Sequence, residues 1–147
     1  MSVFSKKHRE LIRKFQVLFI ADNCGEIIFD RVLLEELDEV EKIVAVKSKP
    51  FINDVTINDV DNTGIDRTAK IMETGTCNLN MDGDEINTEF RNIFNKANII
   101  ISKGHANFEA LHGECEDIFF LLRAKCDVVA NILGVCKGDF VFTKFSE

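Results

Sequence analysis

The fold is decided by residues 17–26, which read Val-Leu-Phe-Ile-Ala-Asp-Asn-Cys-Gly-Glu. The first five form a continuous apolar run with β-branched and aromatic members, which is typical of a strand buried on both faces of a sheet. Asp22 and Asn23 end the run, and Gly25 follows closely. From Ile27 to Leu37, apolar residues recur at helical spacing with acidic residues on the other side. The stretch therefore predicts a buried strand, a polar loop and an amphipathic helix.

The same alternation recurs along the chain. Further strands are expected at Ile43–Val46, Ala69–Met72, Ile99–Ile101 and Ile118–Leu122, with Phe140–Phe142 as a final edge strand. Further helices are expected at Lys6–Phe15, in a segment after Pro50 that carries Asn53 and Asp54, at Glu85–Asn95 and at Val128–Leu133, where Gly134 caps the helix. Strands separated regularly by helices imply parallel pairing through right-handed crossovers. We therefore predict an α/β fold, a three-layer α/β/α arrangement around a Rossmann-like, mostly parallel sheet.

Composition narrows the class of protein. The chain has 147 residues, 46% of them hydrophobic, and 25 acidic against 18 basic side chains give a net charge of −7. Residues 1–147 carry no linker or repeat, so we expect a single domain. The sequence is acidic and has no cluster of Lys and Arg that could bind the phosphates of a nucleic-acid backbone, so we expect no nucleic-acid partner. We also expect no membrane span, no signal peptide and a cytoplasmic location.

Cysteine and phenylalanine usage leads to two expectations about the core. The five cysteines are spread widely with no Cys-x-x-Cys pair, so we expect reduced and mostly buried thiols. The 13 phenylalanines lie in apolar stretches of a chain without Trp or Tyr, so we expect them to fill the core.

Polar residues gather where the predicted strands end, and ligands of such sheets bind beyond the carboxyl ends of the strands. Asp22 and Asn23 follow the first strand, and Asp54 follows the second. Their carboxylate and amide oxygens suit Mg²⁺ or Mn²⁺ rather than zinc. The alternative interpretation is that Asp22 and Asn23 cap the following helix, since both residue types are preferred N-caps.

Basic residues follow two later strands and suggest an anion site at the same edge. Lys103 and Lys125 could hold a phosphate, and Gly104 would allow close backbone approach to it at a helix N-terminus. Taken singly, each lysine is more typical of a solvated surface charge than of an anion site. Cys24 has no His at a spacing that predicts a Cys–His pair, which favours a structural role. His105 and His112 are more typical of helix surfaces or loops than of ligands.

Four ordered blocks resemble the DUF89 family, the metal-dependent damage-control phosphatases, and especially its short archaeal-type members. The blocks read Ala-Asp-Asn-Cys-Gly-Glu-Ile-Ile-Phe-Asp-Arg (21–31), Lys-Pro-Phe-Ile-Asn-Asp-Val-Thr (49–56), Ser-Lys-Gly-His-Ala-Asn-Phe-Glu (102–109) and Leu-Leu-Arg-Ala-Lys-Cys (121–126). The resemblance extends from about residue 15 to residue 142, nearly the whole chain.

Carried over residue by residue, the resemblance implies that Asp22, Asn23 and Asp54 bind a divalent ion such as Mg²⁺, Mn²⁺, Co²⁺ or Ni²⁺. It implies that Glu26 and Asn107 contact the substrate, and that Lys103 and Lys125 hold its phosphate. The implied reaction is hydrolysis of a phosphomonoester on a small metabolite: a sugar, a nucleotide or a damaged metabolite. The implied chemistry uses the metal to polarise a phosphoryl oxygen and the lysines to offset charge.

Larger members of the family carry a helical region before the strand that ends in Asp-Asn, whereas about fifteen residues precede it here. The resemblance therefore implies that the catalytic core alone is present, with a second copy or a separate helical partner covering the site. Two functions of other classes stay open. One is a receiver-like signalling domain, and the other is a phosphate-, nucleotide- or flavin-binding module without catalysis.

Overall fold

A six-stranded sheet organises the chain. The computed structural model describes residues 15–61, 63–77, 79, 81, 83–114 and 118–144, so the helix expected at Lys6–Phe15 lies outside the described residues except for Phe15. The strands are β1 (Gln16–Ile20), β2 (Glu41–Val46), β3 (Lys70–Glu73), β4 (Ile99–Lys103), β5 (Ile118–Arg123) and β6 (Phe140–Lys144). Their order is β3-β2-β1-β4-β5-β6, parallel except for the β5–β6 pair. This is the doubly wound order of a Rossmann-like sheet, and the predicted fold class is confirmed.

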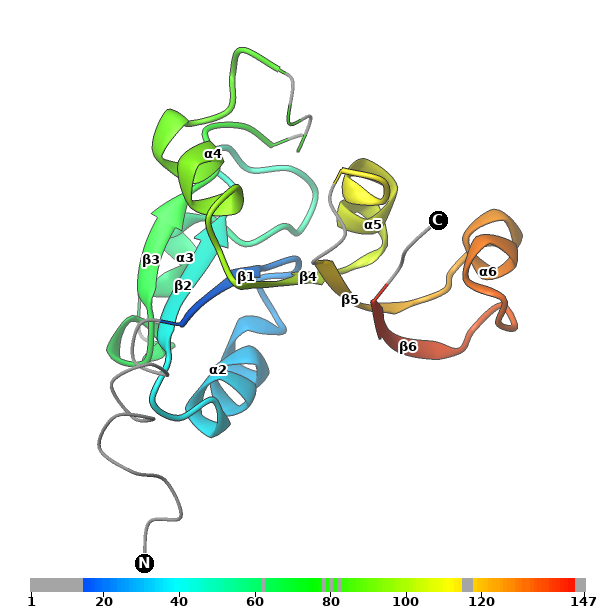
Figure 1. The fold of residues 1–147 in the computed structure, drawn as a ribbon, viewed down its shortest axis with the longest axis horizontal. Helices are drawn as coiled ribbons and strands as arrows, with labels where there is room; N and C mark the ends of the chain where they lie inside the picture. The colour runs from blue at the N-terminus through cyan, green and yellow to red at the C-terminus, as the bar shows by residue number, and fades with distance from the viewer. Residues whose placement is uncertain are drawn as a thin grey trace, which may run out of the picture.

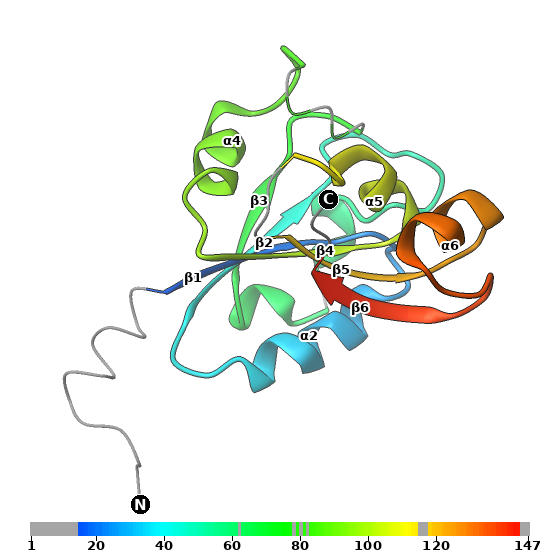
Figure 2. The ribbon, with the colours of Figure 1, turned by 45° about the vertical axis from the view of Figure 1, so that its right-hand side comes forward.

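Helices cover both faces of this sheet. Helices α4 (Thr88–Phe94), α5 (His105–Leu111) and α6 (Asp127–Leu133) lie on one face, and α2 (Ile27–Glu36), α3 (Ile57–Val60) and the 3₁₀ turn η1 (Ile65–Arg67) pack on the other (Figures 1 and 2). Each face has its own apolar core. No helix in the described ranges is long and apolar enough to span a membrane.

The central strands contain continuous apolar runs because both of their faces are covered. In β1, Leu18 and Ile20 point into the core under α4 and α5, whereas Val17 and Phe19 point into the core against α2. All four are 3% exposed or less. Alternation of side chains between faces explains why a continuous apolar run, rather than an alternating one, predicted this strand.

The segment after Pro50 differs from the prediction. Asn53 and Asp54 precede the helix rather than lying in it, because α3 begins after Thr56. The backbone N–H and hydroxyl of Thr56 both donate to the carboxylate of Asp59, at 2.8 Å each, in a capping box that defines the helix start. Asp54 is thereby left in a loop at the edge of the sheet, where its carboxylate is available to a ligand.

The expectations for cysteine and phenylalanine were partly wrong. Among the described cysteines, Cys24 and Cys136 are exposed and Cys77 and Cys126 are half-buried, all as free thiols, while Cys115 lies outside the described residues. Several phenylalanines do fill the core, but Phe29, Phe140 and Phe142 are 75%, 83% and 61% exposed. The reason is structural: Phe29 lies on the outer side of α2, and β6 is an edge strand, so these stretches meet the core with one face alone.

Candidate active site

Two loops meet at the carboxyl ends of β1 and β2 and bring the predicted metal ligands together. Asn23 and Asp54 form an antiparallel β-bridge. The backbone N–H of Val55 donates to the carbonyl oxygen of Asp22 at 2.8 Å. The predicted grouping of Asp22, Asn23 and Asp54 at one edge therefore follows from main-chain pairing between the two loops.

The two carboxylates of this edge are in an unfavourable electrostatic position without a cation. Burial raises the pKa of Asp22, repulsion from Asp54 and Glu26 raises it further, and Lys125 and Lys103 oppose the shift. Burial also raises the pKa of Asp54. A divalent cation favours the ionised form of both groups, and oxygen donors are the ligands that Mg²⁺ and Mn²⁺ prefer. The donor set thus fits a hard divalent metal.

The capping alternative for Asp22 and Asn23 does not describe the structure. Helix α2 begins at Ile27, with Glu26 at the N-cap position, so neither residue lies at the cap. The side-chain oxygen of Asn23 instead accepts a hydrogen bond from the N–H of Gly25 at 2.7 Å, an Asx turn that fixes its orientation. A carbonyl oxygen has two lone pairs, so one remains for a metal.

Gly104 contacts a different group from the one expected. A Cβ atom at this position would lie 2.2 Å from the carboxylate of Asp22, and the backbone has φ +88°. The close backbone approach predicted for Gly104 is therefore an approach to Asp22. Contact between Gly104 and a phosphate remains a prediction.

Lys103 is already paired with two carboxylates. Its ammonium lies 2.7 Å from Oδ1 of Asp30 and forms a second ion pair with Glu26. Burial by itself would lower the pKa of Lys103, but the hydrogen bonds to Asp30 and Glu26 raise it above the ordinary value, so the side chain stays charged. Asp30, which sequence reasoning missed, is the buried partner, whereas Glu26 is half-exposed.

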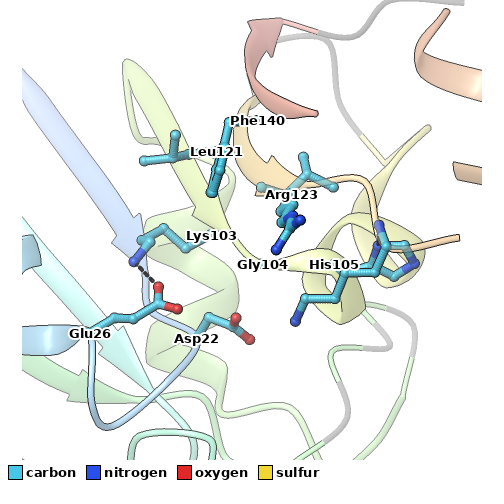
Figure 3. A pocket seen from close by; sticks show the side chains of 10 residues that line it. Asp22, Glu26, Lys103, Gly104, His105, Leu121, Arg123 and Phe140 are labelled. Atoms are coloured by element: carbon cyan, nitrogen blue, oxygen red, sulfur yellow. Dashed lines mark hydrogen bonds and ion pairs between the residues drawn. The ribbon is translucent and has the colours of Figure 1, made fainter. Parts of the chain in front are cut away.

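A cavity of ≈290 Å³ opens beside these residues. Figure 3 shows Asp22, Glu26 and Lys103 on one side of it, with Arg123 and His105 on the other. Lys125 also lines it and is exposed, and Phe140 forms part of the wall. This first cavity joins the predicted phosphate-binding residues to Asp22.

A second cavity of ≈400 Å³ lies beside Asp54. It is lined by Lys47, Phe51, Asp54, Cys77, Leu79, Ala106, Asn107 and Ala110. Lys47 is 3% exposed and was missed by sequence reasoning, although it is the first polar residue after a predicted strand. Asn107 is also buried: its oxygen accepts from Lys47 at 3.0 Å. Substrate contact by Asn107 stays a prediction, since its position is that of a support for Lys47.

Asn107 also ties the strand ends together. Its amide nitrogen donates to the carbonyl oxygens of Lys103, at 2.7 Å, and of Ala21, at 3.1 Å. One buried side chain thus links the ends of β1 and β4 to the ammonium of Lys47.

A second group of side chains that could hold a metal ion lies beside the first cavity, which one of its members, His105, lines. Ligand atoms of His105, Glu109 and Cys126 lie within 4.8 Å of one another. Nε2 of His105 is 3.4 Å from Glu109 and 3.6 Å from the sulfur of Cys126. The N–H of Lys125 points at Nδ1, at 3.4 Å, which places the proton of a neutral ring on Nε2. The three residues are therefore arranged as a hydrogen-bonded cluster. A zinc ion bound through Nε2 of His105 would have to displace the proton on that atom.

Comparison with known proteins covers most of the chain. The family described as "Damage-control phosphatase ARMT1-like domain" matches residues 4–141. A protein named damage-control phosphatase PH1575, from Pyrococcus horikoshii, is 42% identical over 137 residues, which are 90% of this chain and 47% of the relative. A damage-control phosphatase from Archaeoglobus fulgidus is 38% identical over 130 residues, 86% of this chain and 45% of the relative.

A solved structure agrees with these matches. The crystal structure of a DUF89 family protein from Pyrococcus horikoshii superposes with a TM-score of 0.82 at 39% sequence identity, covering 95% of this chain and 51% of that chain. The chain spans about half the length of the relatives that it matches.

Proposed function

The chain belongs to the ARMT1-like damage-control phosphatase family, and from that premise we propose that it is a divalent-metal-dependent phosphomonoester hydrolase. The proposed substrate is a small phosphorylated metabolite: a sugar phosphate, a nucleotide or a damaged metabolite. One observation carries the proposal. Asp22 and Asp54, two partly buried carboxylates of which Asp54 raises the pKa of Asp22, are joined by paired loops at one sheet edge, and each lines a cavity of its own.

In the proposed site, Asp22, Asn23 and Asp54 hold Mg²⁺, Mn²⁺, Co²⁺ or Ni²⁺. The bound ion supplies Lewis-acid polarisation of a phosphoryl oxygen and a position for water. The pairing of the two loops fixes the backbone positions from which the three side chains project, so little backbone reorganisation would accompany binding.

The two lysines differ in how directly they can meet a phosphate. Lys125 is exposed on the first cavity, and the described residues form no ion pair with it, so a phosphate can approach it without breaking one. Lys103 would exchange its half-exposed partner Glu26 for a phosphate oxygen while keeping the buried Asp30. Both would offset negative charge on the transferring group.

The receiver-like alternative does not fit the observed topology. Receiver domains have the strand order 2-1-3-4-5, whereas here β1 lies between β2 and β4. A binding module without catalysis would have the same fold. An assay of phosphate release distinguishes it from a phosphatase.

A metal-by-substrate screen tests the proposal. The protein is stripped with chelator and assayed with Mg²⁺, Mn²⁺, Co²⁺ and Ni²⁺ against sugar phosphates, nucleotides and p-nitrophenyl phosphate. We expect release of inorganic phosphate that requires an added metal. Phosphate binding without release under every pairing would support the non-catalytic module instead.

A further inference from the structure

We infer that the second cavity, beside Asp54 and Lys47, is the subsite for the leaving group of the phosphoester. The leaving group that it fits has an apolar face and an oxygen that accepts a hydrogen bond from Lys47. This inference rests on the proposed function, because a leaving group exists only if the protein cleaves an ester.

The position of the cavity is the first argument. Asp22 lines the first cavity and Asp54 lines the second, and the bridge between Asn23 and Asp54 holds these residues at one edge. A substrate held at this edge would therefore border both cavities, the one lined by Asp22 and the one lined by Asp54. One cavity can take the phosphoryl oxygens and the other the rest of the substrate.

The linings of the two cavities assign these roles. The first has three basic side chains, Lys103, Arg123 and Lys125, against the two carboxylates of Asp22 and Glu26, beside apolar walls from Leu121, Leu122 and Phe140. The second has largely apolar walls, formed by Phe51, Leu79, Ala106 and Ala110. A phosphate dianion is best accommodated among cations, and the organic part of the substrate against apolar walls. The volume of ≈400 Å³ lies in the range that small-molecule sites occupy.

Lys47 supplies a buried hydrogen-bond donor to this cavity, whose polar lining also includes Asp54 and Asn107. Its ammonium is almost fully buried and has three N–H donors, yet within the described residues one hydrogen bond is made, to Asn107. Burial lowers the pKa of Lys47, and the carboxylates of Asp54 and Asp22 oppose that shift. Leaving donors of a buried ammonium unmatched is costly, so an acceptor oxygen on a ligand would be favourable here.

A steric variant tests the assignment. Ala106 is exposed, lines the second cavity and lies on α5, where leucine is compatible with a helix. Ala106→Leu should raise KM for a hexose phosphate and for p-nitrophenyl phosphate by about tenfold, the size of effect that one added alkyl group has in a pocket. The inhibition constant of orthophosphate should not change, because phosphate occupies the first cavity.

A charge variant tests the role of Lys47. Lys47→Met should lower kcat/KM for a hexose phosphate at least tenfold and leave orthophosphate inhibition unchanged. Lys49→Met is the matched control, since Lys49 is exposed two residues away on the same loop, and it should behave like the wild type. Thermal unfolding of each variant checks that the fold is retained.

The outcomes separate this inference from the proposed function. Suppose that the wild type is active. The leaving-group assignment alone would then be overturned if Ala106→Leu left KM unchanged, or if it weakened orthophosphate inhibition as much as it raised KM. A wild type that releases no phosphate with any of the four metals would overturn both.

Discussion

Gly104 and Asp22 lie so close together that a Cβ atom on Gly104 would be 2.2 Å from Cγ of Asp22. Their strands are neighbours, with Ile20 of β1 opposite Ser102 of β4, so the two chain segments leave the sheet side by side. The Asp22 carboxylate, after β1, can thus occupy its position because residue 104, after β4, has no side chain. Any larger residue at 104 must displace either the backbone or the carboxylate.

Gly104→Ala should therefore abolish metal-dependent phosphate release as effectively as removal of Asp22 does. Part of any loss in stability comes from φ +88° itself, which costs a non-glycine residue about 1–3 kcal/mol. Gly113→Ala isolates that part, because Gly113 has φ +91° and no described atom lies within 4 Å of where its Cβ would stand. Equal activity in the two alanine variants would show that contact with Asp22 does not matter.

The raised pKa of Asp22 makes the metal-free protein sensitive to pH. Because the folded pKa lies above the ordinary value of 3.8, the folded state binds the proton more tightly than the unfolded state does. Ionisation of Asp22 therefore lowers the free energy of unfolding as the pH rises from about that value through the folded pKa. Asp22→Asn removes this contribution while other titrating groups remain in both proteins.

Urea unfolding at pH 4 and pH 7 in the presence of chelator measures the effect. The wild type should lose more stability over this interval than Asp22→Asn. Addition of Mn²⁺ should reduce the difference by favouring the ionised carboxylate. The interpretation fails if the Asp22→Asn variant shows the same pH dependence of stability as the wild type.

The two partners of Lys103 should contribute very differently to stability. Asp30 has a side chain 5% exposed, so Asp30→Ala leaves a buried ammonium poorly matched and should cost about 3–5 kcal/mol. The side chain of Glu26 is 50% exposed, so Glu26→Ala should cost no more than about 1 kcal/mol. Urea titration at pH 7 measures the free energy of unfolding of both variants. Equal losses would contradict the assignment of Asp30 as the structural partner of Lys103 and Glu26 as the exchangeable one.

Much of the fold was predictable because local patterns and tertiary packing agree. The apolar run at 17–21 predicted a strand that two layers cover, and the positions of Asp22 and Asp54 after strands predicted that they meet. Strand order was not predictable, since pairing between β1 and β4 depends on residues about eighty positions apart.

Residues whose roles depend on distant partners were also missed. Lys47 reads as one more lysine in a loop until Asn107, sixty positions later, accepts its hydrogen bond. The contact between Cys126 and His105 was not predicted, because the two residues lie 21 positions apart in sequence. The ion pairs of Lys103 with Glu26 and Asp30 were also not predicted, and phosphate binding by Lys103 stays a prediction. In each case the decisive contact joins separate elements of the fold.

The central claim is that Asp22 and Asp54 hold a divalent metal on which phosphate release depends. The most direct test measures release from p-nitrophenyl phosphate during Mn²⁺ titration of the chelator-stripped wild type, Asp22→Ala and Asp54→Ala, with thermal unfolding as the check on folding. We predict saturable, metal-dependent release by the wild type, its loss in excess chelator, and its absence from both folded variants. Full activity in either variant, or in the presence of excess chelator, would contradict the claim.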